Sequence, residues 1–187
     1  MKKILFLVLT VNFATAQMMS EKLLDINPSK SKIKWIGEYT FYFGGHDGTI
    51  RFDQGHFIKN NDVITGGDFI IDMTSITCND IEDREANESL VNHLKDPDFF
   101  DVAKHKKARL SITRVEYHTK TTMRIEANMT IKDKTMPINF QAEVDYVTKT
   151  MTAKFKIDRR RWDIIYKSSL EDNGISDAIG FEVTVSL

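Results

Sequence analysis

The residue types that most often carry enzyme chemistry are not spaced for it in this chain. The sequence has five histidines: His46, His56, His93, His105 and His118. None belongs to an H-x-H or H-E-x-x-H pattern, so we expect no metal site and no cofactor. Ser168 and Ser169 lack the flanking glycines of a nucleophile elbow, and no phosphate-binding glycine loop follows a strand. The sequence therefore predicts no catalytic site, and we do not expect an enzyme.

Two charged clusters have both a chemical and a structural interpretation. Glu82, Asp83 and Glu85 could act as an acid and base, but neighbouring acids more simply favour the positive end of a helix dipole. Residues 159–161 are three arginines, and in an extended strand at least one of them points to the apolar face. That arginine could bind an anionic headgroup or pair with an aspartate, and both interpretations stay open. The nearby aspartates are Asp158, Asp163 and Asp177.

These residues must be positioned by strands, because apolar and polar side chains alternate along most of the chain. Residues 122–132 alternate without an error, and the same period of two returns at 138–146, 151–157 and 179–187. Successive side chains of a strand point to opposite faces, so each of these strands has one dry and one wet face.

The alternation and the turns between the runs predict eight strands. The expected ranges are 33–43, 50–58, 63–73, 107–118, 121–132, 135–147, 150–159 and 178–187. Links of two to four residues near 119, 133 and 148 force antiparallel neighbours. We therefore predict an all-β fold, an eight-stranded antiparallel up-and-down barrel, with a two-sheet sandwich as the alternative.

Glycines mark a turn and a bulge in the first half of the chain. His46 stands between Gly44-Gly45 and Gly48, where it is either a turn residue or a ligand contact. Gly66-Gly67 predicts a bulge in the third strand, and the parity slip between Ile112 and Val115 predicts another.

Two insertions interrupt the strands. Residues 74–106 include a helix, capped by Asn79 or Asp80 and ending before Pro97. Its apolar face carries Ala86, Leu90 and Leu94. Residues 160–177 form the second insertion, and each insertion is expected to lie across the barrel mouth or outside the barrel.

The composition fits a single globular domain. The chain has 187 residues, of which 41% are hydrophobic, and a formal net charge of −1. That balance gives no electrostatic reason to expect nucleic-acid binding. Cys78 is the only cysteine, so an internal disulfide is excluded, and we expect a packed thiol rather than a reactive one.

The first residues resemble a secretory signal peptide. Lys2 and Lys3 precede an apolar run that ends in Ala14-Thr15-Ala16, a small-x-small cleavage pattern. The run is shorter than the ~20 residues a membrane span needs, and we expect no stable membrane insertion. We expect residues 1–16 to be a signal peptide, 17–31 a polar lead-in, and 32–187 the barrel domain. Gln17 replaces the cysteine of a lipoprotein, so the mature protein would be periplasmic or secreted.

Several motifs in order resemble the YceI-like family, from about Lys32 to Leu187. They are Trp35 with residues 44–48, residues 66–73 with Ser75-Ile76, residues 93–102, residues 129–132, Asp158-Arg159 with Trp162 and Tyr166, and residues 175–177. The resemblance implies a lipocalin-like periplasmic barrel that holds a polyisoprenoid or another amphipathic lipid. Asp133 and Asp163 stand where the family usually has glycine.

The apolar positions of the alternating strands and the family resemblance together select the candidate ligand-binding residues. They are Trp35, Phe41, His46, Phe52, Met129, Phe140, Phe155, Arg159, Trp162 and Phe181. The expected partner is a long-chain isoprenoid, a quinone-like lipid or a fatty lipid. A homodimer, an enzyme of isoprenoid metabolism using the same pocket, and a structural module with a filled lumen stay open as alternatives.

Export gives the first testable prediction. If Ala16 ends a signal peptide, protein recovered from the periplasm or medium should begin at Gln17 on N-terminal sequencing. Cytoplasmic protein that retains Met1 would contradict it.

Overall fold

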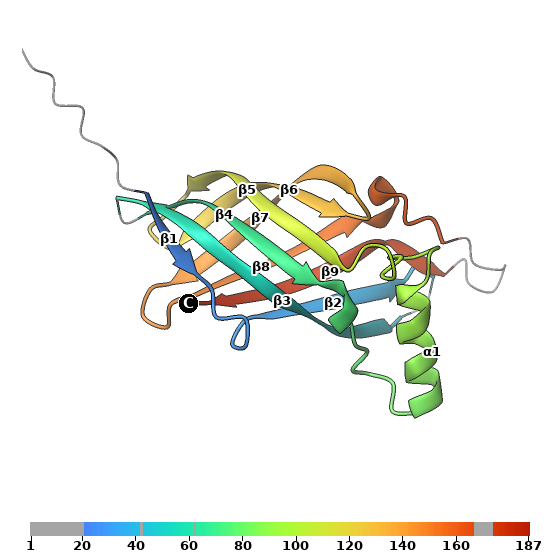
Figure 1. The fold of residues 1–187 in the computed structure, drawn as a ribbon. Helices are drawn as coiled ribbons and strands as arrows, with labels where there is room; N and C mark the ends of the chain where they lie inside the picture. The colour runs from blue at the N-terminus through green and yellow to red at the C-terminus, as the bar shows by residue number, and fades with distance from the viewer. Residues whose placement is uncertain (1–20, 42, 62, 167–173) are drawn as a thin grey trace, which may run out of the picture.

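Nine strands form one continuous antiparallel sheet in the computed structural model, which describes residues 21–187 except 42, 62 and 167–173 (Figure 1). The strands are β1 (Glu21–Asp25), β2 (Lys32–Tyr39), β3 (Gly45–Asn60), β4 (Val63–Asp72), β5 (Lys107–Tyr117), β6 (Thr122–Ile131), β7 (Lys134–Asp145), β8 (Thr150–Asp158) and β9 (Ile175–Ser186). The helical elements are η1 (Met73–Ser75), α1 (Arg84–Lys95) and η2 (Arg159–Trp162). The expected signal peptide lies outside the described residues.

The sheet closes on itself. The strand order is β1-β3-β2-β9-β8-β7-β6-β5-β4, and an additional pairing between β3 and β4 joins the two sides. Strands β2 to β9 therefore make an eight-stranded barrel in which every strand pairs with its sequence neighbours, and β9 returns to β2 through pairs such as Trp35 with Phe181. The predicted barrel is confirmed, and the sandwich is wrong.

The ninth strand was not predicted. β1 lies inside the expected lead-in and pairs with the second half of β3, from Glu21 opposite Asn60 to Asp25 opposite His56. β2 pairs with the first part of the same edge, with Ile33 opposite Ile50. Four of the five residues of β1 are exposed, so no alternation revealed it.

The alternating face of β6 and β7 points into the barrel, as predicted. Met123, Ile125, Ala127, Met129 and Ile131 are all buried, whereas the residues between them are exposed or half-buried. Their partners on β7 follow the same parity, because Ile125 stands opposite Phe140 and Ala127 opposite Ile138. Cross-strand pairs of this kind fix the register as well as the burial.

Both bulges exist, one of them a residue away from its predicted place. Between β3 and β4 the register slips after Ile58–Gly66, which leaves Thr65 as the extra residue beside the glycine pair. Between β5 and β6 the register slips after Ile112, which leaves Thr113 as the extra residue.

β7 and β8 are paired only toward one end of the barrel, from Ala142–Ala153 to Asp145–Thr150. Nearer the other end, η2 and the residue after it bind β7. The Arg161 guanidinium donates to the carbonyl of Pro137 at 2.8 Å, and Lys134 Nζ lies 2.7 Å from Asp163 Oδ1. Ile164 is fully buried, so this part of the second insertion packs into the fold.

The first insertion carries α1, which lies at one end of the barrel (Figure 1). Asp83 caps the helix by accepting from the N–H of Ala86 at 2.8 Å, so the prediction of Asn79 or Asp80 as the cap is wrong. Asp80 is instead bonded to β3, through the N–H of Asp47. The helix ends at Lys95, before Pro97 as predicted.

Tyr117 and Met123 pack at the opposite end of the barrel. The Tyr117 hydroxyl accepts from the N–H of Ile64 at 2.9 Å and so ties β5 to β4. Met123 is fully buried beside them, at the position opposite Tyr117.

Within the described part of the chain, no helix combines the length and the apolar content needed to cross a membrane.

The assigned faces predict opposite effects for two adjacent substitutions. Met129→Arg should lower the free energy of unfolding by roughly 3–5 kcal/mol, because it buries an unpaired charge in the barrel. Asn128→Arg, one residue away on the outer face, should change it by less than about 0.5 kcal/mol. Urea unfolding followed by circular dichroism measures both, and equal losses would contradict the assignment.

Candidate ligand-binding cavity

A cavity of about 680 Å³ occupies the lumen. It extends from Phe57 and Ile112, within the barrel wall, to α1 at the open end. We call this open end the mouth; β2 and β8 end there, and β3 and β9 begin there. The volume is within the range of small-molecule sites, and apolar side chains form most of the lining.

Eight of the ten predicted ligand-binding residues line this cavity. They are Trp35, His46, Phe52, Met129, Phe140, Phe155, Arg159 and Phe181. They come from β2, β3, β6, β7, β8, β9 and η2, so closure of the sheet brings together residues up to 146 positions apart in sequence.

Phe41 does not line the cavity, and its side chain is 75% exposed. The prediction extended the alternation of β2 to residue 43, but the strand ends at Tyr39. The N–H of Thr40 then bonds to the carbonyl of Gly174. Because Phe41 lies beyond the end of the strand, the alternation of side-chain directions along β2 does not extend to it. Phe43 is exposed yet borders the cavity, which places the mouth in contact with solvent.

Trp162 also lies outside the cavity lining, although it is fully buried. Its indole N–H donates to the carbonyl of Met129 at 3.0 Å, and the Arg161 guanidinium lies 5.4 Å from its ring. The residue therefore supports the wall strand that carries Met129 and does not face the cavity.

Aromatic rings make two rigid parts of the wall. Phe140 and Phe155 stack with centroids 4.6 Å apart and planes at 17°, and Phe181 lies 5.5 Å from Phe155. Elsewhere in the lining, Phe69 packs against Phe57 at 5.0 Å and Phe52 at 6.1 Å. Stacked and edge-on contacts of this kind stabilise the positions of the rings along the wall.

α1 and the second insertion meet over the mouth. Ala86, Leu90 and Leu94, the predicted apolar face, all line the cavity. His93 packs edge-on against Tyr166, with ring centroids 4.4 Å apart. The sequence left open whether each insertion lies across the barrel mouth or outside the barrel. The described parts of both insertions lie at the mouth.

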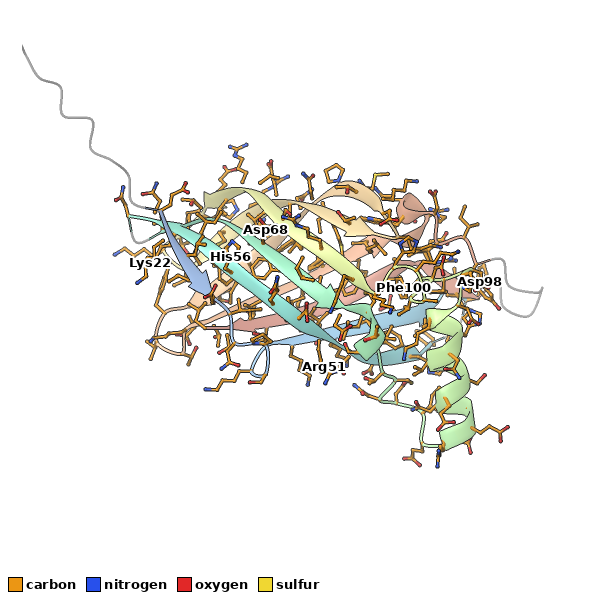
Figure 2. All side chains as sticks on the ribbon, viewed as in Figure 1. Lys22, Arg51, His56, Asp68, Asp98 and Phe100 are labelled. Carbon is orange, nitrogen blue, oxygen red and sulfur yellow. The ribbon has the colours of Figure 1, made fainter. Side chains whose placement is uncertain are left out.

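The loop after α1 supplies two wall residues that sequence reasoning did not select. Phe99 and Phe100 pack at 4.9 Å and both line the cavity, and Phe100 lies close to α1 (Figure 2). Two adjacent phenylalanines outside any alternating strand were the available signal, because an exposed loop seldom carries them.

Gly48 permits close packing of the first insertion on the barrel. Its strand partner Trp35 donates through Nε1 to the carbonyl of Thr77 at 2.9 Å. A Cβ at residue 48 would collide with that carbonyl and lie 2.5 Å from the indole nitrogen. Glycine is therefore required for Trp35 to reach its partner.

The polar side chains of the lining gather at the mouth, apart from Thr152. They are Glu38, Tyr39, His46, Ser89, His93, Arg159, Tyr166 and Ser176. An apolar interior with polar groups at one end suits an amphipathic ligand.

His46 lies in β3 rather than in the predicted turn, and it belongs to a hydrogen-bonded group at the mouth. Its Nδ1 is 3.1 Å from Asp80 Oδ2, and its Nε2 is 3.0 Å from the Tyr39 hydroxyl. Asp80 also accepts from the N–H of Asp47 at 3.2 Å and from the Cys78 thiol at 3.1 Å.

These contacts shift two pKa values. Burial raises the pKa of Asp80, but hydrogen bonds from Cys78, Asp47 and His46 outweigh burial and hold it below its ordinary value of 3.8. Burial, together with the bond to Asp80, raises the pKa of the Cys78 thiol. Cys78 is thus less able to form the reactive thiolate.

Arg159 is the member of the arginine run that faces the lumen. It is 5% exposed, and its Nη2 lies 3.0 Å from Asp177 Oδ1. Its Nη1 donates to the carbonyl of Ile164 at 2.7 Å. Of the three aspartates considered from sequence, Asp177 is the partner of Arg159.

Among the residues that the structure describes, no group of three or more histidine, cysteine, aspartate or glutamate side chains is placed to hold a metal ion.

A closed eight-stranded barrel with an apolar lumen open at one end is the architecture of the lipocalin-like binding proteins. The sequence profile of the YceI-like domain matches residues 24–187. The chain belongs to the YceI-like family.

Solved structures share the fold at low sequence identity. Burkholderia cenocepacia BcnA has a TM-score of 0.70 and 14% identity, over 86% of this chain and 98% of that chain. The Campylobacter jejuni YCEI protein has a TM-score of 0.52 and 14% identity, over 98% and 91% of the respective chains. No curated protein matches the sequence significantly.

The mouth cluster predicts a pH dependence of stability. The folded protein holds Asp80 ionised at pH values where the unfolded chain binds a proton. The carboxylate therefore contributes stability above the ordinary pKa of 3.8, and this is lost as the pH falls through the folded value. Asp80→Asn should reduce the melting temperature at about pH 6 more than at about pH 3. Equal reductions at both pH values would contradict it.

Proposed function

We propose that this protein binds an amphipathic lipid with a long isoprenoid or similar chain in its lumen, and stores or carries it through an aqueous compartment. The observation that carries the proposal is the cavity of about 680 Å³, with apolar walls and polar groups gathered at its mouth. Membership of the YceI-like family supports the same ligand class.

The energetics favour a long chain over a compact metabolite. Each methylene removed from water contributes about 0.8 kcal/mol, so a chain that fills the lumen gains from every unit. Ordering the ligand and the mouth offsets much of this gain. Selectivity should therefore depend more on chain length and shape than on polar detail.

The compartment is part of the proposal. Lys2, Lys3 and the Ala14-Thr15-Ala16 pattern support export, which would deliver the barrel to the periplasm or the medium. A lipid chain cannot cross such a space unaided, because its apolar surface is excluded from water.

The alternative of a structural module with a filled lumen predicts no room for a ligand. The opposing aromatic groups around Phe69 and Phe155 instead line an open cavity. The alternative of an enzyme shares the pocket and differs only in that the lipid would be chemically changed.

A pair of substitutions tests the function. Ala153 is a small residue of the cavity wall, so Ala153→Phe should fill part of the lumen and weaken uptake of a long polyprenoid at least tenfold. Lys154→Phe adds the same ring on the outer face and should leave uptake unchanged. Native protein should also yield one lipid per chain on solvent extraction and mass spectrometry.

Two outcomes would redirect the interpretation. Native protein that contains no lipid and takes up no offered polyprenoid, quinone or fatty acid would favour the structural module. Recovery of the offered lipid as a new product would favour the enzyme.

A further inference from the structure

Arg159 has one nitrogen atom that makes no hydrogen bond within the described part of the chain. Nη1 and Nη2 bind the Ile164 carbonyl and Asp177, but the buried Nε has no hydrogen-bond partner among the described residues. The residue is 5% exposed and lines the cavity. A buried N–H of a charged group without an acceptor is costly, and such a group in a cavity wall indicates a ligand atom that completes it.

The charge of Arg159 is already balanced. Asp177 is shared, since Oδ1 lies 3.0 Å from Arg159 Nη2 and Oδ2 lies 3.0 Å from Arg160 Nη1. Arg160 is also held by both oxygens of Asp158, at 3.0 and 2.8 Å. Two guanidinium groups thus face two carboxylates, and the cluster as a whole is neutral.

The described lining offers no other permanent positive charge. Arg159 is its one arginine, and it contains no lysine. Of its two histidines, His46 faces Asp80 and His93 packs between aromatic rings. An anionic headgroup placed beside Arg159 would lose hydration without meeting an uncompensated cation of the described lining.

On the basis of the lipid-binding function proposed above, we infer that the headgroup is an uncharged oxygen acceptor, such as a hydroxyl, carbonyl or ether, which accepts from Arg159 Nε. One neutral acceptor satisfies one free donor. A diphosphate would bring several negative charges to a guanidinium whose own charge Asp177 already compensates. The lipid would lie with its head beside η2 and its tail toward Phe57.

Three ligands with the same isoprenoid chain separate the headgroup classes. They are geranylgeraniol, geranylgeranyl diphosphate and the corresponding hydrocarbon without a headgroup. Competition with a bound fluorescent lipid should rank the alcohol about tenfold above the hydrocarbon, the value of one hydrogen bond to a charged donor. The alcohol should also bind more tightly than the diphosphate.

Substitutions assign the preference to the Nε donor. Arg159→Met keeps an unbranched side chain in the wall and leaves Asp177 paired with Arg160, so the alcohol and hydrocarbon should bind with similar affinity. Arg160→Met removes an equally close partner of Asp177 without touching the cavity, and should keep the alcohol preference. The wild-type ranking decides the inference if Arg159→Met does not fold.

Tighter binding of the diphosphate, or equal binding of alcohol and hydrocarbon, would overturn the inference and leave lipid binding intact. A loss of preference in both variants would overturn the role of Nε. Failure of all three ligands to bind would contradict the lipid-binding function as well.

Discussion

The hydrogen bonds between β3 and β4 close the sheet, and the other features of the molecule depend on that closure. Each strand has one apolar face, which an open sheet of this size would leave exposed to water. Closure turns these faces inward, and toward the mouth, where β7 and β8 are not paired, η2 binds β7 instead. β3 has 16 residues whereas β2 has eight, so part of its edge extends beyond its neighbour. β1 covers that part, from residue 56 to residue 60, and this explains a strand whose own side chains are mostly exposed.

Closure alone does not produce a cavity, because small barrels are commonly filled by their own side chains. In this barrel the two ends differ. Tyr117 and Met123 pack at one end, whereas aromatic rings toward the mouth pack along the wall and against one another. A ring that stacks on its strand neighbour cannot also cross the lumen, so Phe140, Phe155 and Phe181 leave space between the walls.

The sequence predicted the features that depend on the alternation of apolar and polar residues. It missed those that depend on contacts between residues far apart in sequence. The alternation of apolar and polar residues identified eight strands and most residues of the cavity wall, because it shows directly which face of each strand is buried. Phe41 was misplaced where the ladder ends, and Trp162 was misplaced because its direction is set by a bond to the Met129 carbonyl. The helix cap was assigned to Asn79 or Asp80, but Asp83 caps the helix and the fold uses Asp80 to hold β3. The unused Nε of Arg159 has no signal in the sequence, since it is defined by the bonds of the other two nitrogens.

The arrangement at the mouth has a consequence for how a ligand is chosen. Arg159 and His46 each face a carboxylate, Asp177 and Asp80. Polar groups that pair with carboxylates of the protein gain little from a charged ligand, because binding must break or stretch those contacts. Apolar burial has no such competition, since each methylene that enters the lumen displaces only water. Under the proposed lipid-binding function, the barrel would therefore recognise the length and shape of a chain, and the polar contacts at the mouth would orient the ligand more than they hold it.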